Sequence, residues 1–187
     1  MPLTSKQLQA RARKIRLLLM AVDGVLTDGR FSYVPGPKGA LMEIKAFHSR
    51  DGLGFRIAHN AGLKTGFISG RSSPVVERRV KELGVHFLKQ EAREKLAPYQ
   101  EILQEAGLKD EQVCYVGDDI VDLPLLTRVG LGVAVGDAHQ LLRRHVHYVT
   151  QARGGFGAIR ETIELILSAQ GKWDAVMAHY LLPSPSF

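Results

Sequence analysis

An apolar segment that ends in an acidic turn constrains this chain more than any other part of its sequence. Residues 15–22 are apolar apart from Arg16, and Asp23 and Gly24 follow at once. A short apolar run bounded by turn residues is typical of a strand buried on both faces, as in a parallel sheet. Ligands of open α/β sheets gather at the carboxyl ends of such strands, so Asp23 is the first candidate site residue. Because Asp-Gly is also a common turn pair, a simple turn is the alternative interpretation of this stretch.

Strand-like and helix-like segments alternate along the rest of the chain. A Pro/Gly turn at 35–39 separates two short strands, which predicts a β-hairpin insertion over about 30–47. Further strands are predicted over 63–68, 85–88, 112–116, 129–135 and 146–149, with helices between them. This alternation predicts an α/β fold with a doubly wound, Rossmann-like parallel sheet. We expect one domain over 1–187, with a C-terminal tail over about 170–187.

Capping residues predict where the helices begin and end. Thr4 or Ser5 is expected to cap a short N-terminal helix, and Asp51 a helix that runs to about residue 60. Another helix is expected over 91–106, because its spacing is helical and a glycine follows. Lys95 would lie inside that helix, where a lysine is most often a surface charge.

Composition narrows the classes of partner. The net charge is +6 and the pI about 9.6, but the basic residues are spread out and no nucleic-acid motif accompanies them. We therefore expect an anionic small substrate and no nucleic acid. The single Cys114 excludes an intrachain disulfide. No segment is apolar enough to cross a bilayer and the N-terminus does not resemble a signal peptide, so a cytoplasmic protein without membrane association is expected.

Polar residues follow three of the predicted strands. Asp23 follows the first strand, Ser69 and Gly70 follow the strand at 63–68, and Asp118 follows the strand at 112–116. Because the carboxyl ends of parallel strands meet at one edge of a sheet, these groups are expected to converge in one crevice. That convergence favours a site over isolated turns.

The types of residue in this crevice indicate phosphate chemistry. Asp118, Asp119 and Asp122 repel one another unless a cation neutralises them, and Mg²⁺ takes such hard oxygen ligands while keeping several waters. Ser69 stands before a helix, where a phosphate is readily held. Lys95 would neutralise charge on a transferring phosphoryl group. Each feature alone is common in turns, caps and surfaces, whereas their combination in this order is specific.

Four ordered motifs resemble those of the haloacid dehalogenase (HAD) superfamily of phosphatases: AVDGVLTDG, ISGR, EKLAPYQ and VGDDIVD. A nearer resemblance, over roughly 14–167, is to the capless, tetrameric branch that hydrolyses 3-deoxy-D-manno-octulosonate 8-phosphate (KDO 8-phosphate). It rests on the hairpin and on the segments FHSRDGLGFR, ISGRSS, GDDIVDLPLL and RGGFGAIRE. The resemblance implies a HAD fold without a cap domain and a Mg²⁺-dependent phosphatase of lipopolysaccharide precursor synthesis. It also implies a homotetramer in which a neighbouring subunit covers the active site. The motifs leave open whether the sugar acid phosphate has eight or nine carbons.

The resemblance also implies roles for individual residues. Asp23 would be the general acid/base, and its backbone carbonyl would contact Mg²⁺. Asp118 would be a direct metal ligand, with Asp122 in support through water or indirect contacts. The phosphoryl group would be bound by Ser69 and Gly70 and steadied by Lys95. Contacts to the sugar acid or to the neighbouring subunit are expected from Arg71, Arg50 and His48.

One position departs from the family pattern Asp-x-Asp. Ala21 stands where the family has the nucleophilic Asp that forms a phospho-aspartate. A methyl group neither attacks phosphorus nor ligates a metal, so covalent catalysis has no nucleophile. A shifted register fails as well, because residue 25 is Val25. We therefore expect this chain to be inactive or strongly impaired.

Two explanations of Ala21 remain open on the sequence. The chain is either an inactivated form of a working phosphatase or a natural pseudo-phosphatase that binds a phosphorylated sugar acid without turnover. The other signature positions, including Lys95 and Asp118, are all present, which favours the first explanation.

Overall fold

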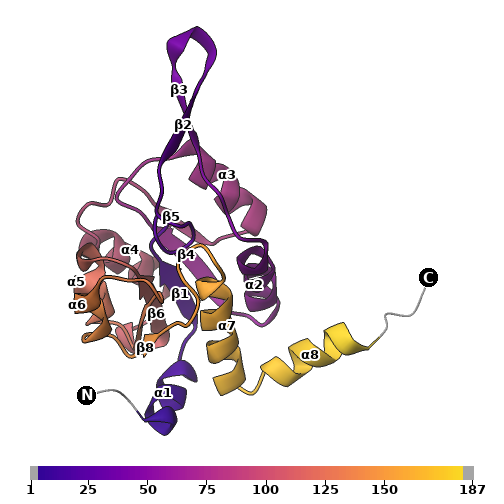
Figure 1. The fold of residues 1–187 in the computed structure, drawn as a ribbon. Helices are drawn as coiled ribbons and strands as arrows, with labels where there is room; N and C mark the ends of the chain where they lie inside the picture. Colours follow the sequence, from indigo (N-terminus) through magenta and orange to yellow (C-terminus); the bar gives the residue numbers. More distant parts are fainter. Residues whose placement is uncertain (1–3, 183–187) are drawn as a thin grey trace.

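The computed structural model describes residues 4–182, and a six-stranded parallel sheet forms its centre (Figure 1). The strand order is β5-β4-β1-β6-β7-β8. These strands are β1 Leu17–Met20, β4 Lys64–Ile68, β5 Phe87–Lys89, β6 Val113–Gly117, β7 Leu131–Ala134 and β8 Tyr148–Val149. All neighbouring pairs in this sheet are parallel, which confirms the predicted α/β fold. The chain winds outward from β1 through β4 to β5 and then returns to β6 beside β1. The β1/β6 boundary is therefore the point where ligands are expected to bind.

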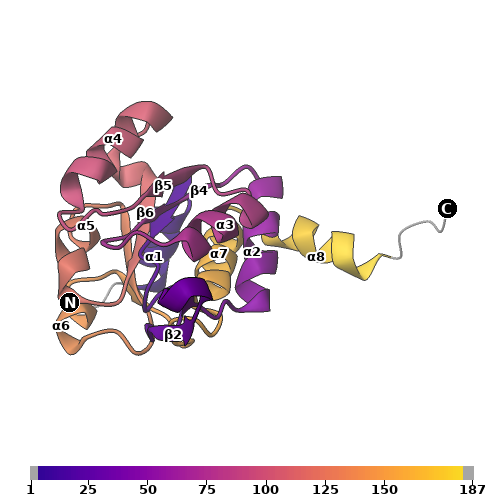
Figure 2. The same cartoon turned by 90° about the horizontal axis from the view of Figure 1, so that it is seen from above.

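Helices cover both faces of the sheet (Figure 2). One side carries α2 Ser49–Asn60, α3 Pro74–Leu83 and α7 Ala158–Ala169, and the other carries α4 Leu96–Ala106, α5 Leu123–Leu126 and α6 Gln140–Arg143. Short 3-10 turns lie at Pro37–Gly39, Asp110–Gln112 and Ile120–Asp122. The first helix, α1 Ser5–Ala12, is capped by Thr4 as predicted and packs against α7. None of the helices described is long and apolar enough to cross a membrane.

Strand β1 is buried on both faces, which explains its unbroken apolar sequence. Its four residues, Leu17–Met20, are fully buried. The strand pairs with β4 on one side and with β6 on the other. The ladder continues past the strand, because the Ala21 backbone N–H donates to the Val116 carbonyl at 3.0 Å. The sheet therefore holds the segment that begins at Ala21 firmly at its carboxyl edge.

The predicted hairpin is present and stands out from the body of the molecule (Figure 1). Its strands, β2 Ser32–Pro35 and β3 Leu41–Ile44, are antiparallel, with Ser32 opposite Ile44. Between β1 and β4 the chain contains this hairpin and α2 and no cap domain.

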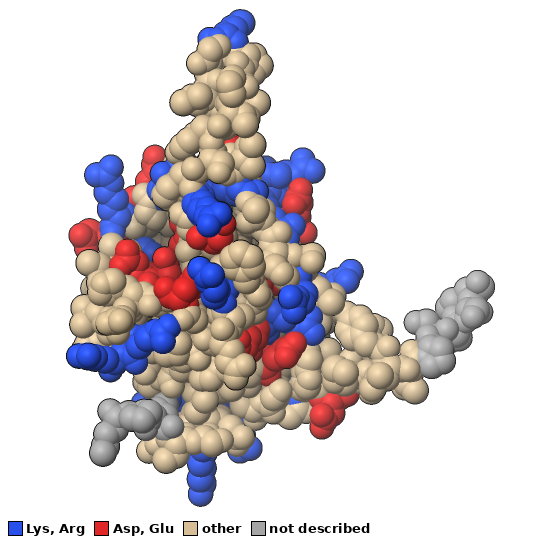
Figure 3. Space-filling model, in the orientation of Figure 1, with Lys and Arg blue, Asp and Glu red and all other residues tan. Residues whose placement is uncertain are grey.

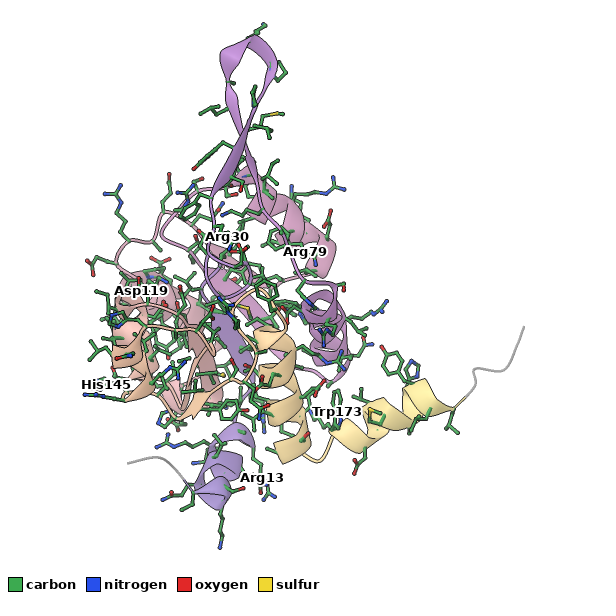
Figure 4. All side chains as sticks on the ribbon, in the orientation of Figure 1. Arg13, Arg30, Arg79, Asp119, His145 and Trp173 are labelled. Atoms are coloured by element: carbon green, nitrogen blue, oxygen red, sulfur yellow. The ribbon has the colours of Figure 1, made fainter. Side chains whose placement is uncertain are left out.

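The C-terminal helix, α8 Trp173–Leu181, projects sideways from the end of α7 (Figure 1). Trp173 lies where α8 begins, with the Arg160 guanidinium carbon 5.4 Å from its ring centroid (Figure 4). The last five residues of the predicted tail, 183–187, lie outside the described residues.

The predicted cap of α2 is wrong. His48 caps this helix, since its Nδ1 accepts from the Arg50 N–H at 3.2 Å. Asp51 lies inside the first turn, where it is buried and accepts from the Arg160 N–H at 2.8 Å. It therefore serves the amino end of α7 rather than that of its own helix, a contact that only the tertiary fold creates.

The predicted start of α4 is also wrong. The helix begins at Leu96, and residues 91–95 form a loop in which Glu91 has a φ of 57°. That loop is tied to the end of β4, because the Ala92 N–H donates to the Ser69 carbonyl at 2.9 Å. Lys95 lies at the N-cap of α4 and is only 7% exposed. It is therefore not a surface charge, which is the usual place of a lysine inside a helix such as the one expected over 91–106.

Candidate active site

The loops after β1, β4, β5 and β6 enclose a crevice of about 250 Å³ at the carboxyl edge of the sheet. Its lining residues are Ala21, Val22, Asp23, Phe31, Ser69, Gly70, Arg71, Ala92, Arg93, Lys95, Asp118, Asp119 and Val121. Seven of the ten residues predicted for the site are among them, although the strands that carry them are far apart in the sequence. The remaining three, Asp122, Arg50 and His48, lie elsewhere.

Asp122 lies behind the wall of the crevice and holds two of its loops. Its fully buried carboxylate accepts from the Asp118 N–H at 3.0 Å and from the Tyr115 hydroxyl at 2.7 Å. The same carboxylate forms an ion pair with Lys95 Nζ at 2.6 Å. Removing one partner of a buried ion pair is strongly destabilising, so this pair fixes Lys95 at the crevice. Asp122 thus contacts the other site residues directly.

Among the carboxylates of the crevice, Asp118 has the most strongly shifted pKa. Burial, followed by the charge of Asp122, raises its pKa to about 7. A Cβ placed on Gly24 would lie 2.0 Å from Asp118 Oδ2, so the loops after β1 and β6 touch at this point. A buried carboxylate with a raised pKa is stabilised in its charged form by a nearby cation.

The donor set fits a hard divalent cation that keeps most of its waters. Asp23 and Asp118 both line the crevice and carry carboxylates, whereas the side chain of Ala21 has no donor atom. Within residues 4–182 no group of three or more His, Cys, Asp or Glu side chains is arranged to hold a metal. Mg²⁺ needs few protein ligands because it retains several waters. These residues therefore fit Mg²⁺ with one carboxylate fewer than the family pattern has.

One side of the crevice is formed by the loop that follows β4. Ser69 is 5% exposed, and its Oγ accepts from the Arg71 N–H at 3.2 Å. Beyond it, Ser73 caps α3 through a bond from the Val76 N–H. Ser69 and Gly70 consequently line the crevice immediately before a helix, as predicted.

The hairpin side of the crevice holds a second charged cluster, which the sequence patterns did not predict. Lys45 forms an ion pair with Asp23 and lies 3.4 Å from Glu43 Oε1. Arg71 donates to Glu43 Oε1 at 3.0 Å and to the Tyr33 hydroxyl at 3.1 Å. Figure 3 shows basic and acidic side chains together beneath the hairpin, whose stem is otherwise largely uncharged.

A two-residue spacing was the sequence signal for this cluster. In an extended segment residues two apart face the same side, so Glu43 and Lys45 share a face while Met42 and Ile44 point the other way. The alternation of charged and apolar residues therefore marked one face of the hairpin as polar.

Arg50 and His48 are not brought into this crevice. His48 caps α2, and Arg50 is exposed. Arg50 lines a separate cavity of about 290 Å³, together with Phe156 and Arg160.

Comparison with known proteins agrees with the fold. A family model described as haloacid dehalogenase-like hydrolase matches residues 87–159. The KDO 8-phosphate phosphatase KdsC of Escherichia coli strain B / BL21-DE3 is 45% identical over 170 residues, which cover 91% of this chain and 88% of the relative. KdsC of Yersinia pestis is 46% identical over 164 residues, covering 88% of this chain and 86% of the relative.

Solved structures show the same likeness over nearly the whole chain. The crystal structure of KDO 8-phosphate phosphatase from Yersinia pestis has a TM-score of 0.86 at 43% identity and covers 91% of this chain and 90% of its own. The enzyme from Moraxella catarrhalis, crystallised with a magnesium ion, a phosphate ion and KDO, has a TM-score of 0.89 at 36% identity, with coverages of 95% and 99%.

The parallel sheet, the crevice at its switch point and the matching family model define a haloacid dehalogenase-like hydrolase. Within that class, the chain belongs to the family of the KDO 8-phosphate phosphatases.

Proposed function

We propose that this chain is the scaffold of a Mg²⁺-dependent phosphatase for KDO 8-phosphate, and that Ala21 abolishes or strongly reduces its turnover. The observation that carries the proposal is the convergence of Ser69, Lys95 and Asp118 with Ala21 in one crevice. The Moraxella catarrhalis relative was crystallised with a magnesium ion and with phosphate and KDO, the two products of such a reaction. Its similarity over nearly the whole chain supports the same ligands here.

Different residues of the crevice bind the phosphoryl group and the metal. Ser69 and Gly70 bind the phosphoryl group, and Lys95, fixed by Asp122, neutralises its charge. Asp118 and the backbone carbonyl of Asp23 hold Mg²⁺. When bound, the metal polarises a phosphoryl oxygen as a Lewis acid.

The roles of Asp23 and Ala21 follow from their neighbouring positions. Asp23 protonates the sugar oxygen as it leaves. Ala21 stands at the end of β1 on the crevice wall, where the family has its nucleophile, and its methyl group forms no bond to phosphorus. Substrate binding is therefore retained while the covalent step is lost.

A natural pseudo-phosphatase is the second candidate. The buried Lys95–Asp122 ion pair is compatible with it, since this side of the crevice is intact without the nucleophile, but the same completeness favours the first candidate. Such a protein would bind a phosphorylated sugar acid and signal its presence. A phosphatase for a nine-carbon sugar acid phosphate is a variant of the first proposal.

The Ala21→Asp substitution tests the proposal. We expect phosphate release from KDO 8-phosphate with Mg²⁺ to rise by several orders of magnitude, since removing a nucleophile costs about 10⁶ in a well-studied serine hydrolase. Ala21→Asn is the matched control, because its side chain has a similar size and no nucleophilic carboxylate. EDTA should abolish the gained activity.

The outcomes separate the candidates. An Ala21→Asp protein that folds and binds Mg²⁺ but cleaves neither the eight-carbon nor the nine-carbon substrate contradicts the phosphatase proposal. Tight calorimetric binding of KDO 8-phosphate to the unchanged chain, together with an Ala codon in the natural gene, would favour the pseudo-phosphatase.

We also propose a homotetramer with active sites near subunit interfaces. The hairpin exposes the apolar side chains of Tyr33, Leu41, Met42 and Ile44. Exposed apolar clusters of this kind mark interaction surfaces.

A further inference from the structure

Lys45 is a buried lysine that belongs to none of the four family motifs. It follows β3 at the base of the hairpin, and its side chain is 1% exposed. Lysines are almost never buried unless they are paired. Here the ammonium group forms an ion pair with Asp23 Oδ1 and lies 3.4 Å from Glu43 Oε1. The Phe31 ring, 5.2 Å away at its centroid, covers it.

The second oxygen of the Asp23 carboxylate also faces a cation on the hairpin side. Arg71 Nε lies 3.9 Å from Asp23 Oδ2, and the Arg71 guanidinium carbon lies 4.1 Å from the Phe31 ring centroid. Arg71 is itself held by Glu43, to which it donates at 3.0 Å. Both oxygens of Asp23 are therefore directed toward groups that the hairpin carries or holds.

The other charged groups of the crevice form a separate cluster. Lys95 pairs with Asp122, which in turn binds the backbone N–H of Asp118. Among residues 4–182, no salt bridge joins Asp23 to Lys95. The crevice is thus divided into a phosphoryl and metal side on the sheet and a carboxylate side beneath the hairpin.

We infer that Lys45 is a positioning residue that holds the Asp23 carboxylate toward the hairpin, where the leaving sugar oxygen departs. This inference rests on the proposed function and extends it to a residue of the hairpin. In the Ala21→Asp protein, the carboxylate introduced at position 21 forms a bond to phosphorus while the phosphorus–oxygen bond to the sugar breaks. The electron pair of the broken bond stays on the sugar oxygen, and the proton of the Asp23 carboxyl moves to that oxygen. Without Lys45, the carboxylate would be free to rotate toward the metal side.

Two substrates distinguish this role from simple support of the fold. Both are assayed in the Ala21→Asp protein: KDO 8-phosphate, whose sugar oxygen needs a proton to leave, and para-nitrophenyl phosphate, whose phenolate leaves without one. We expect Lys45→Met to lower kcat for the sugar phosphate by about 10²–10³, within the usual contribution of general acid catalysis, and to lower it less than about tenfold for the aryl phosphate.

Conservative and distant variants complete this test. Lys45→Arg should recover part of the lost kcat, because a guanidinium also pairs with Asp23. Lys14→Met, at an exposed position before β1 and so at the opposite edge of the sheet, should leave both substrates unaffected. Equal losses on the two substrates in Lys45→Met would overturn the proposal.

A stability measurement tests the same contact without activity. Melting temperatures of the unchanged chain in EDTA are compared for Lys45→Met, Asp23→Asn and the double variant. We expect the melting temperature of the double variant to fall by clearly less than the sum of the two single losses, because each single change removes the nearest partner of the other charge. Additive losses would overturn the proposal. If the losses in melting temperature are non-additive but the Ala21→Asp protein is inactive, the contact between Lys45 and Asp23 is supported and the proposed phosphatase function is not.

Discussion

At the scale of single residues, Asp118 makes the stability of the metal-free protein depend on pH. Burial and the charge of Asp122 raise the pKa of Asp118 from 3.8 to about 7. Between those values the folded state binds more protons than the unfolded state, so stability falls as the pH rises through that window. Asp118→Asn removes this ionisation and should therefore stabilise the protein most above pH 7.

Calorimetry in EDTA measures this effect directly. We expect Asp118→Asn to raise the melting temperature at about pH 8 by several degrees, since 1 kcal/mol corresponds to about 2–4 °C in a chain of this size. At about pH 4 the difference should be much smaller, because Asp118 is then protonated in the folded parent as well. An equal shift at both pH values would contradict the assigned pKa.

The residues in and next to the crevice differ in how far the sequence predicts them. Asp23, Ser69 and Asp118 are predictable because each follows an apolar strand, and parallel strands bring such positions together. Lys45 is not predictable in the same way, since its contact with Asp23 exists only after the hairpin folds back over the sheet edge. The wrong helix start before Leu96 hid the burial of Lys95 for a similar reason.

At the scale of elements, the glycine-rich segment 153–157 supports the loop that carries Asp23. The Gly155 N–H donates to the Val25 carbonyl at 2.9 Å. A Cβ on Gly154 would lie 1.7 Å from the Gly24 carbonyl oxygen. Because the obstructing atom belongs to the backbone, the loop after β1 would have to move to admit a side chain.

Gly154→Ala should therefore disturb both stability and the site. Overpacking costs about 1–3 kcal/mol, which corresponds to roughly 3–10 °C in the melting temperature. In the Ala21→Asp background the same change should also lower kcat, since the loop holds Asp23. Gly62→Ala measures backbone strain without a collision, because Gly62 has a φ of 81° and no neighbour within 4 Å of a new Cβ. A Gly154→Ala protein that melts and turns over like its parent would show that the contact is unimportant.

The sequence predicts the elements better than their exact extents. Strand β1 and the hairpin follow from an apolar run and a Pro/Gly turn, which are local signals. The order of the strands and the start of α4 depend instead on contacts between distant segments, such as the bond from Ala92 to Ser69. The fold class is therefore readable from the sequence, whereas the loop geometry that shapes the crevice is not.

At the scale of the whole molecule, the hairpin and α8 project from the body (Figure 1), and most of the exposed large apolar side chains of the described residues lie on these two parts. The hairpin exposes Leu41 and Ile44, and α8 exposes Tyr180 and Leu181. A hairpin without a hydrophobic face packed against other structure is only marginally stable in water. Its stem is held by the charged cluster at Asp23, but its tip has no such support within one subunit. Covering by other copies of the chain is the arrangement that the homotetramer proposal supplies.

Sedimentation analysis tests this proposal with a pair of variants. We expect the unchanged chain to sediment as a tetramer and the Leu41→Glu, Ile44→Glu double variant as smaller species with its fold intact, because charges buried without partners in an apolar interface are costly. Leu181→Glu on α8 is the control that adds a charge to the other exposed apolar surface. In the Ala21→Asp background, dissociation should also lower activity if a neighbouring subunit covers the crevice. A stable monomer of the unchanged chain would contradict both the tetramer and a site completed by a neighbour.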